Sequence, residues 1–219
     1  MSTSIVRAAS AAFLLLAAST AAFAQEPADS AARARRPTVH ILPSYSSVDF
    51  TVLGFEKGAT GGVAALGESR VYGLAAEVAT PLRGVDVRVG LAYSRPQLRA
   101  DRPDVRNETT RASVTMLTVD AVVRGPRLLD VRPYLLLGGG VRHFDFAGAS
   151  FDGEGGRQFT DNHLVPVVHA GLGLAWDVGR YDLYLEGNRY FSTIGDNERF
   201  EGEDVRTRAF TVGVRIPVN

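Results

Sequence analysis

The residues of this 219-residue chain that could carry acid–base chemistry are four histidines and the acids near them. A histidine acts as a general base when an acid orients its ring and a hydroxyl lies within hydrogen-bond reach. His169 lies on the polar face of a predicted strand and could pair with Glu186 of the next one. We favour a structural role for this histidine, and we expect no catalytic residue and no enzyme.

Apolar residues alternate with polar or small residues along several segments, and some of the polar positions are charged. In the stretch VDVRVGLAYS at 85–94, Asp86 and Arg88 alternate with Val85, Val87 and Val89. Successive side chains of a strand point to opposite faces, so each such segment has an apolar face and a polar face. The charged residues of the polar faces, together with one histidine, are Glu77, Asp86, Arg88, Asp120, Arg124, His169, Glu186 and Arg215. Both signs are present, so these side chains could pair inside a barrel.

A second charged group lies in RPQLRADRPDVRNETTR at 95–111. Its arginines are Arg95, Arg99, Arg102, Arg106 and Arg111. Guanidinium groups bind phosphate in a bidentate manner, so this basic patch could bind lipopolysaccharide phosphates or an acidic polymer. Because Asp101, Asp104 and Glu108 are interleaved with the arginines, we favour a solvated, self-paired loop.

Composition excludes several kinds of site. The chain has no cysteine, which excludes disulfides and thiolate metal sites. The acids Asp152, Glu154 and Asp161 do not have the spacing of a compact calcium loop, so we expect no metal and no cofactor. The 24 basic residues balance 24 acidic residues, and this balance gives no argument for nucleic-acid binding.

Eight strands are predicted to position the charged residues. They cover about 38–50, 69–80, 85–94, 111–124, 131–146, 164–177, 180–191 and 205–218. The first alternates poorly and contains Pro43, which removes a backbone donor. The links at 51–68, 96–110, 147–163 and 192–204 are long, whereas those at 81–84, 125–130 and 178–179 are short. This alternation is typical of an up-and-down barrel that spans a membrane.

Two all-β architectures fit the alternation. In a soluble barrel or sandwich the valine and leucine rows are buried, whereas in a membrane barrel they face lipid and the polar faces fill the interior. Small residues with a few opposed charges suit the narrow interior of an eight-stranded barrel. Trp176 and Tyr181 flank a short link and Tyr72 and Tyr93 lie towards the long links, as interfacial aromatic residues would. We therefore favour an eight-stranded antiparallel transmembrane barrel over 38–219.

The N-terminal segment is predicted to be a secretory signal peptide over 1–24. Arg7 precedes the apolar run AAFLLLAAS at 11–19, and Ala22-Phe23-Ala24 fits the small-x-small cleavage pattern. The apolar run is shorter than the ~20 residues that a spanning helix needs. Residues 25–37, QEPADSAARARRP, are predicted to form a disordered periplasmic leader.

The C-terminal half resembles the small bacterial outer-membrane β-barrels of the outer membrane protein A and opacity-protein type. The resemblance is carried by RPYLLLGGGVRHF at 132–144, VVHAGLGLAWDVGRYDLYLEGNRYF at 167–191 and FTVGVRIPV at 210–218. It implies a porin-like barrel in the cell envelope of a Gram-negative bacterium, with both termini periplasmic. The family usually ends on an aromatic residue that the insertion machinery reads, whereas this chain ends Val218-Asn219.

The resemblance implies a structural, adhesive or surface-interaction role. Its implied partners are outer-membrane lipid and lipopolysaccharide, the outer-membrane insertion machinery and an unidentified extracellular ligand. Barrel deacylases of lipid A would need a histidine with a serine two residues later, and none of the four histidines has one. The alternatives left open are a lipid-modifying enzyme with a triad built across strands, and a soluble periplasmic barrel that binds a small apolar ligand.

Overall fold

The computed structural model describes residues 39–51, 53–55, 63–102, 105–145, 149–150, 158–159, 162–194 and 203–218. The signal peptide and leader predicted over 1–24 and 25–37 lie outside the described residues. Among the residues described, no helix has the length and apolar character needed to cross a membrane.

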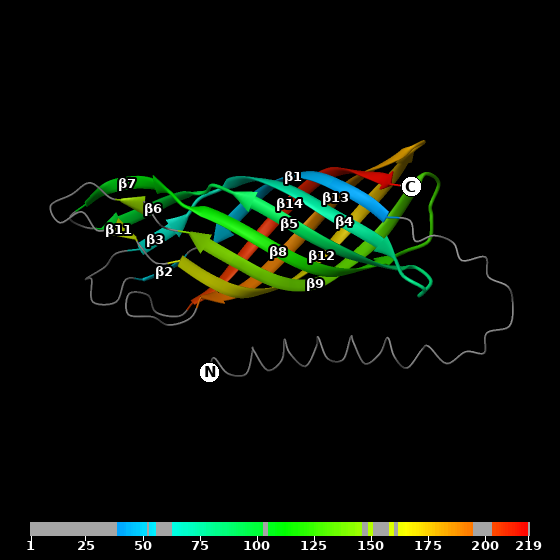
Figure 1. The fold of residues 1–219 in the computed structure, drawn as a ribbon. Helices are drawn as coiled ribbons and strands as arrows, with labels where there is room; N and C mark the ends of the chain where they lie inside the picture. Colours follow the sequence, from blue (N-terminus) through cyan, green and yellow to red (C-terminus); the bar gives the residue numbers. More distant parts are fainter. Residues whose placement is uncertain are drawn as a thin grey trace, which may run out of the picture. The chain divides into compact units, whose positions relative to one another are not determined.

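Eight antiparallel strands form a closed barrel (Figure 1). They are β1 (Val39–Thr51), β4 (Ser69–Ala79), β5 (Val85–Ser94), β8 (Ser113–Arg124), β9 (Val131–Asp145), β12 (Asn162–Val178), β13 (Tyr181–Ile194) and β14 (Glu203–Val218). Each strand pairs with the next barrel strand in the chain, and β1 closes the barrel by pairing with β14. The predicted eight-stranded fold is therefore confirmed, with strand ends within a few residues of those expected.

Pro43 lies inside β1 without ending the strand. The β1–β4 ladder runs through this position, where Pro43 pairs with Leu74. The β1–β14 ladder instead skips Leu42 and Pro43 between the pairs Ile41–Ile216 and Ser44–Gly213. A proline has no N–H to donate, so it weakens the ladder on one side only.

The three short links are tight turns at one end of the barrel. Gly84, before β5, has a φ of 81°, and Gly179, between β12 and β13, has a φ of 79°. Glycine adopts this left-handed backbone without a steric penalty, which lets the chain reverse within few residues. In the β8–β9 turn the left-handed residue is Leu129, with a φ of 58° and an almost fully exposed side chain.

The long links contain strands, contrary to the expectation of plain loops. β2 (Leu53–Phe55), β3 (Val63–Leu66), β6 (Gln97–Arg102) and β7 (Val105–Arg111) form a four-stranded sheet in the order β2-β3-β6-β7. β10 (Ala149–Ser150) pairs with β11 (Gln158–Phe159). A short segment can join a sheet when a neighbouring segment supplies its backbone hydrogen bonds, and hydrophobic alternation does not reveal such a partner.

The interior of the barrel is apolar towards the long links. A cluster of buried side chains comprises Val48, Phe50, Leu66, Val71, Leu98, Ala112, Val114, Phe144, Val165, Val167, Tyr190 and Ala209. Leu66 and Leu98 come from the four-stranded sheet, so that sheet packs against side chains from the barrel wall. The prediction of an interior filled by small residues and opposed charges did not include this apolar cluster.

Candidate functional site

The barrel has an outer face of exposed apolar side chains, and most of its buried charged residues lie in the interior towards the short turns. Val89 and Leu172 are 45% and 66% exposed, whereas Glu77 is completely buried. Arg88 and Asp120, on the opposite faces of their strands from the valines, are 6% and 5% exposed. A soluble barrel would bury the valine and leucine rows, so this arrangement is the inverse of a soluble protein.

Glu77 lies at the centre of the interior charge cluster. Its carboxylate accepts hydrogen bonds from Nε and Nη2 of Arg88, at 3.1 and 3.0 Å. It also pairs with Arg124 and, at 3.0 Å, with Nε of Arg215. Three arginines from β5, β8 and β14 therefore share one carboxylate of β4. A buried carboxylate is tolerated when it is paired in this way.

Further acids complete the pairing of these arginines. Arg124 donates from Nε to Asp86 at 2.5 Å. Arg215 donates from Nη1 to Asp182 at 2.8 Å and lies 3.9 Å from Asp86. The network therefore links β4, β5, β8, β13 and β14 near the short-turn end of the barrel. Asp182 was not in the predicted set of charged interior residues. It is four residues from Glu186 on the same strand, and strand side chains alternate between faces, so both lie on one face.

Arg88 joins Glu77 to a second carboxylate across the barrel. It donates to Glu186 of β13, which also accepts a hydrogen bond from the Tyr134 hydroxyl at 2.8 Å. The Arg88 guanidinium lies 5.8 and 5.6 Å from the ring centroids of Tyr134 and Tyr184. Pairing with two carboxylates and packing against two aromatic rings stabilise this cation where water is scarce.

Two glycines make room for these tyrosines. Tyr134 pairs in register with Gly173, and Tyr184 pairs with Gly213. A Cβ at either glycine would overlap the tyrosine ring. Each tyrosine ring therefore packs against a glycine on the neighbouring strand, which has no side chain to collide with the ring.

His169 pairs with Asp120, and the expected pairing with Glu186 was wrong. Nε2 of His169 lies 2.5 Å from Oδ1 of Asp120. The ladders place Asp120, Gly138 and His169 in one row across β8, β9 and β12, and a Cβ at Gly138 would meet both polar groups. Glu186 is four residues away from Tyr190, the residue of β13 that pairs with His169.

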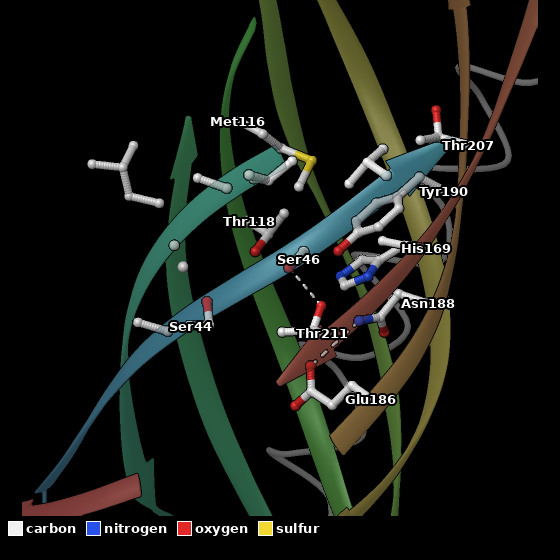
Figure 2. A pocket seen from close by; sticks show the side chains of 18 of the residues that line it. Ser44, Ser46, Met116, Thr118, His169, Glu186, Asn188, Tyr190, Thr207 and Thr211 are labelled. Carbon is white, nitrogen blue, oxygen red and sulfur yellow. Dashed lines mark hydrogen bonds between the residues drawn. The ribbon is translucent and has the colours of Figure 1, made fainter. Parts of the chain in front are cut away.

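A cavity of about 100 Å³ lies in the middle of the interior (Figure 2). Its polar lining includes Ser46 and Thr211, whose hydroxyls are hydrogen-bonded at 2.7 Å. His169 stacks on Tyr190 at 4.7 Å between ring centroids, and its buried Nδ1 has no hydrogen-bond partner among the described residues. Unpaired polar atoms beside a cavity of this size are suited to binding ordered water.

Arg142 is a buried residue of the interior that the sequence analysis missed. It is 2% exposed, donates to Thr207 at 3.0 Å and lies 5.5 to 5.9 Å from the ring centroids of Phe50, Phe144 and Tyr190. Within the described ranges, no carboxylate lies within ion-pair distance of it. Residues 138, 140 and 142 of β9 lie on the same face of the strand, because strand side chains alternate between faces. The glycines Gly138 and Gly140 could therefore have placed Arg142 in the interior.

The predicted basic patch is only partly described. Arg95 and Arg111 are exposed. The backbones of Arg99, Arg102 and Arg106 belong to β6 and β7, and their side chains lie outside the described part of the chain. No group of histidines, cysteines and acids that could hold a metal ion occurs among the residues described.

Exposed aromatic residues lie towards both ends of the outer face. Tyr72 and Tyr93 are exposed near the long-link ends of β4 and β5, and Tyr181 is exposed beside the β12–β13 turn. Tyr45 and Tyr72 pack edge to face, with 5.8 Å between ring centroids. Trp176 is half-buried rather than fully exposed. Aromatic residues at both ends of an apolar band are typical of a membrane barrel.

Comparison with known proteins finds similarity at the level of structure only. No protein-family model matches the chain, and no curated protein does. Neisserial surface protein A is 12% identical with a TM-score of 0.49, over 82% of this chain and 97% of that one. The attachment invasion locus protein Ail of Yersinia pestis is 15% identical with a TM-score of 0.48, over 84% and 100%. A major outer membrane protein from Thermus thermophilus is 12% identical with a TM-score of 0.46, over 82% and 99%.

Proposed function

We propose that this chain is an integral outer-membrane barrel with a structural or surface-interaction role and a closed interior. One observation carries the proposal: rows of valines and leucines are exposed on the closed barrel, while Glu77, Arg88, Asp120 and Glu186 are buried inside it. Water would be a poor solvent for such an exterior, whereas hydrocarbon suits it. A closed barrel also leaves no unpaired strand edge in the lipid, which is a condition for crossing a bilayer with strands.

The interior favours a structural role over transport of solutes. The cluster around Glu77 is dense and paired, and the apolar cluster that includes Phe50, Phe144 and Leu98 fills the barrel towards the long links. The cavity between them, about 100 Å³, is smaller than the ~300–1,000 Å³ typical of a small-molecule site. This size also counts against an apolar ligand held inside the barrel.

The position of His169 counts against a lipid-modifying enzyme. The His169–Asp120 pair has the acid–base geometry of a catalytic dyad, but both side chains are buried inside the barrel. Acyl chains of a lipid would reach the outer face instead. No hydroxyl of the described residues is hydrogen-bonded to His169 Nδ1. We therefore assign the pair to stabilisation of the interior and place the role of the protein at its surface.

Membrane fractionation combined with gel mobility tests the proposal. We expect the full chain to stay in the membrane fraction after a high-salt wash and to be released by detergent. A folded outer-membrane barrel should also migrate as a compact species in dodecyl sulfate unless it is boiled. Release by salt alone, or the same mobility with and without boiling, would overturn the proposal.

A further inference from the structure

Four exposed charged residues lie at one height on one side of the barrel wall. Arg189 of β13, Arg208 of β14, Asp49 of β1 and Arg70 of β4 all belong to the outward faces of adjacent strands. Counted from the short-turn ends Tyr181, Val218, Val39 and Ala79, they lie 8, 10, 10 and 9 residues along their strands. We call Arg70, Arg189 and Arg208 the wall arginines.

The other half of the wall carries one described charge at this height, Arg95, which is exposed and follows the last residue of β5. The corresponding outward residues are Tyr93 of β5, Thr115 of β8, Val141 of β9 and Val168 of β12. A strand rises ~3.3 Å per residue and a barrel strand is tilted by ~35–45°, so each residue adds about 2.5 Å along the axis. The wall arginines therefore lie roughly 20–25 Å from the short-turn end, close to the upper edge of an apolar band ~25 Å tall.

Two of the wall arginines are direct cross-strand neighbours. Arg189 pairs in register with Arg208, and like charges in this position repel each other. Arg189 stacks on Phe191 at 5.4 Å from the ring centroid. Within the described ranges, neither Arg189 nor Arg208 has a carboxylate at ion-pair distance, although Asp49 is the register partner of Arg208. An anion between the two guanidinium groups would remove the repulsion.

We infer that the wall arginines bind the phosphate of a phosphorylated lipid headgroup in the outer leaflet. The inference rests on the proposed function, because only a membrane-embedded barrel places these residues at headgroup height. Guanidinium pairs bind phosphate oxygens in a bidentate manner. The acyl chains of the same lipid would then run along the exposed apolar row below, which includes Phe210, Val212 and Leu183. This site is centred on Arg189 and Arg208 of β13 and β14, whereas the predicted basic patch begins at Arg95, beside Arg70.

The experiment measures how lipid changes the thermal stability of the refolded full chain in neutral detergent. The probes are diphosphoryl lipid A, its dephosphorylated form, and inorganic phosphate at equal concentration. We expect diphosphoryl lipid A to raise the boiling-shift midpoint temperature, and the other two probes to leave it unchanged. An equal rise with dephosphorylated lipid or with free phosphate would overturn the assignment to a lipid phosphate.

Two double variants that each remove two positive charges, at opposite ends of the barrel, locate the site. Arg189→Gln with Arg208→Gln should weaken the apparent affinity for diphosphoryl lipid A about thirtyfold, because each basic residue near a membrane surface contributes about 1 kcal/mol. The control, Arg132→Gln with Arg180→Gln, removes two exposed arginines at the short-turn end and should leave the affinity unchanged. Equal losses in the two double variants would overturn the site.

A variant that strengthens binding serves as a further control, because misfolding could explain a loss of affinity but not a gain. Asp49→Asn removes the only acid in the row of four and should strengthen binding of diphosphoryl lipid A. If Asp49→Asn bound diphosphoryl lipid A no more tightly than the wild type, the Asp49 carboxylate would not lie near the phosphate, and this result would overturn the site. A wild-type chain that forms no compact, boiling-sensitive species would overturn the proposed function itself, whereas a folded chain indifferent to lipid A would overturn only this site.

Discussion

Near the short turns, the barrel interior holds Arg88 between two carboxylates, whereas towards the long links it holds Arg142 among three aromatic rings. Arg88 pairs with Glu77 and Glu186. Arg142 has a hydrogen bond to Thr207 and a long contact to the Met116 sulfur at 3.7 Å. Both cations are buried, at 6% and 2% exposure.

The difference shows two physical ways to keep an arginine away from water. Ion pairing stabilises both partners, so removal of one leaves the other charge buried and uncompensated. Contact with the face of an aromatic ring stabilises the cation without a second charge, and its removal leaves no buried charge behind. Substitutions in the two halves of the interior should therefore have very different costs.

Glu77→Gln should give the largest effect. It keeps the shape of the side chain but removes the charge shared by Arg88, Arg124 and Arg215. Breaking a buried ion pair costs about 3–5 kcal/mol, so we expect the free energy of unfolding in lipid vesicles to fall by about that amount. Equilibrium unfolding in urea measures it.

The matched control is Asp130→Asn, which also removes one carboxylate from an arginine. Asp130 pairs with Arg127 at 3.2 Å on the exposed β8–β9 turn. Exposed ion pairs contribute about 0–1 kcal/mol, so the control should unfold almost like the wild type. Equal losses in Glu77→Gln and Asp130→Asn would show that the interior cluster is not shielded from water.

Gly213→Ala should give an intermediate effect that reports the packing of the charged half. The added methyl group would overlap the ring of Tyr184, which packs beside Arg88. Overpacking of an interior costs about 1–3 kcal/mol. Gly187→Ala is the control, since its Cβ would point from the outer face into open space and should cost almost nothing. A Gly213→Ala variant as stable as Gly187→Ala would mean that the tyrosine moves freely.

The strands and the outward rows were predictable because alternation with period two is a local property of the sequence. Val87, Val89 and Leu172 occur in regular rows, and the ladders keep those rows on one face. The register was not predictable to the same degree. His169 meets Asp120 across Gly138 because three strands align at one row, and a histidine and an acid 49 residues apart give no local signal of that alignment.

The apolar filling towards the long links was harder to predict for a related reason. Val71, Val114 and Phe144 lie on the inward faces of strands that also carry the buried charges Glu77, Asp120 and Arg142. Alternation assigns their face correctly, but it gives no sign that they pack with Leu66 and Leu98, which come from strands in the long links. The glycine-rich link at 51–68 and the arginine-rich link at 96–110 do not show a clear alternation, so the strands that carry both leucines were not predicted.

Arg142→Met should give the smallest effect and should have the opposite sign to Glu77→Gln. The methionine would lose the ring contacts and the bond to Thr207, but it would replace a buried cation by an apolar side chain among Phe50, Phe144 and Tyr190. Replacement of buried charges by apolar residues is often neutral or stabilising, so we expect unfolding in urea to cost about 1 kcal/mol more. Arg142→Lys keeps the charge without the planar group that stacks on rings, and it should be less stable than Arg142→Met. If Arg142→Met instead lost as much stability as Glu77→Gln, the cation would have to be compensated by a buried anion, and the two halves of the interior would follow the same principle.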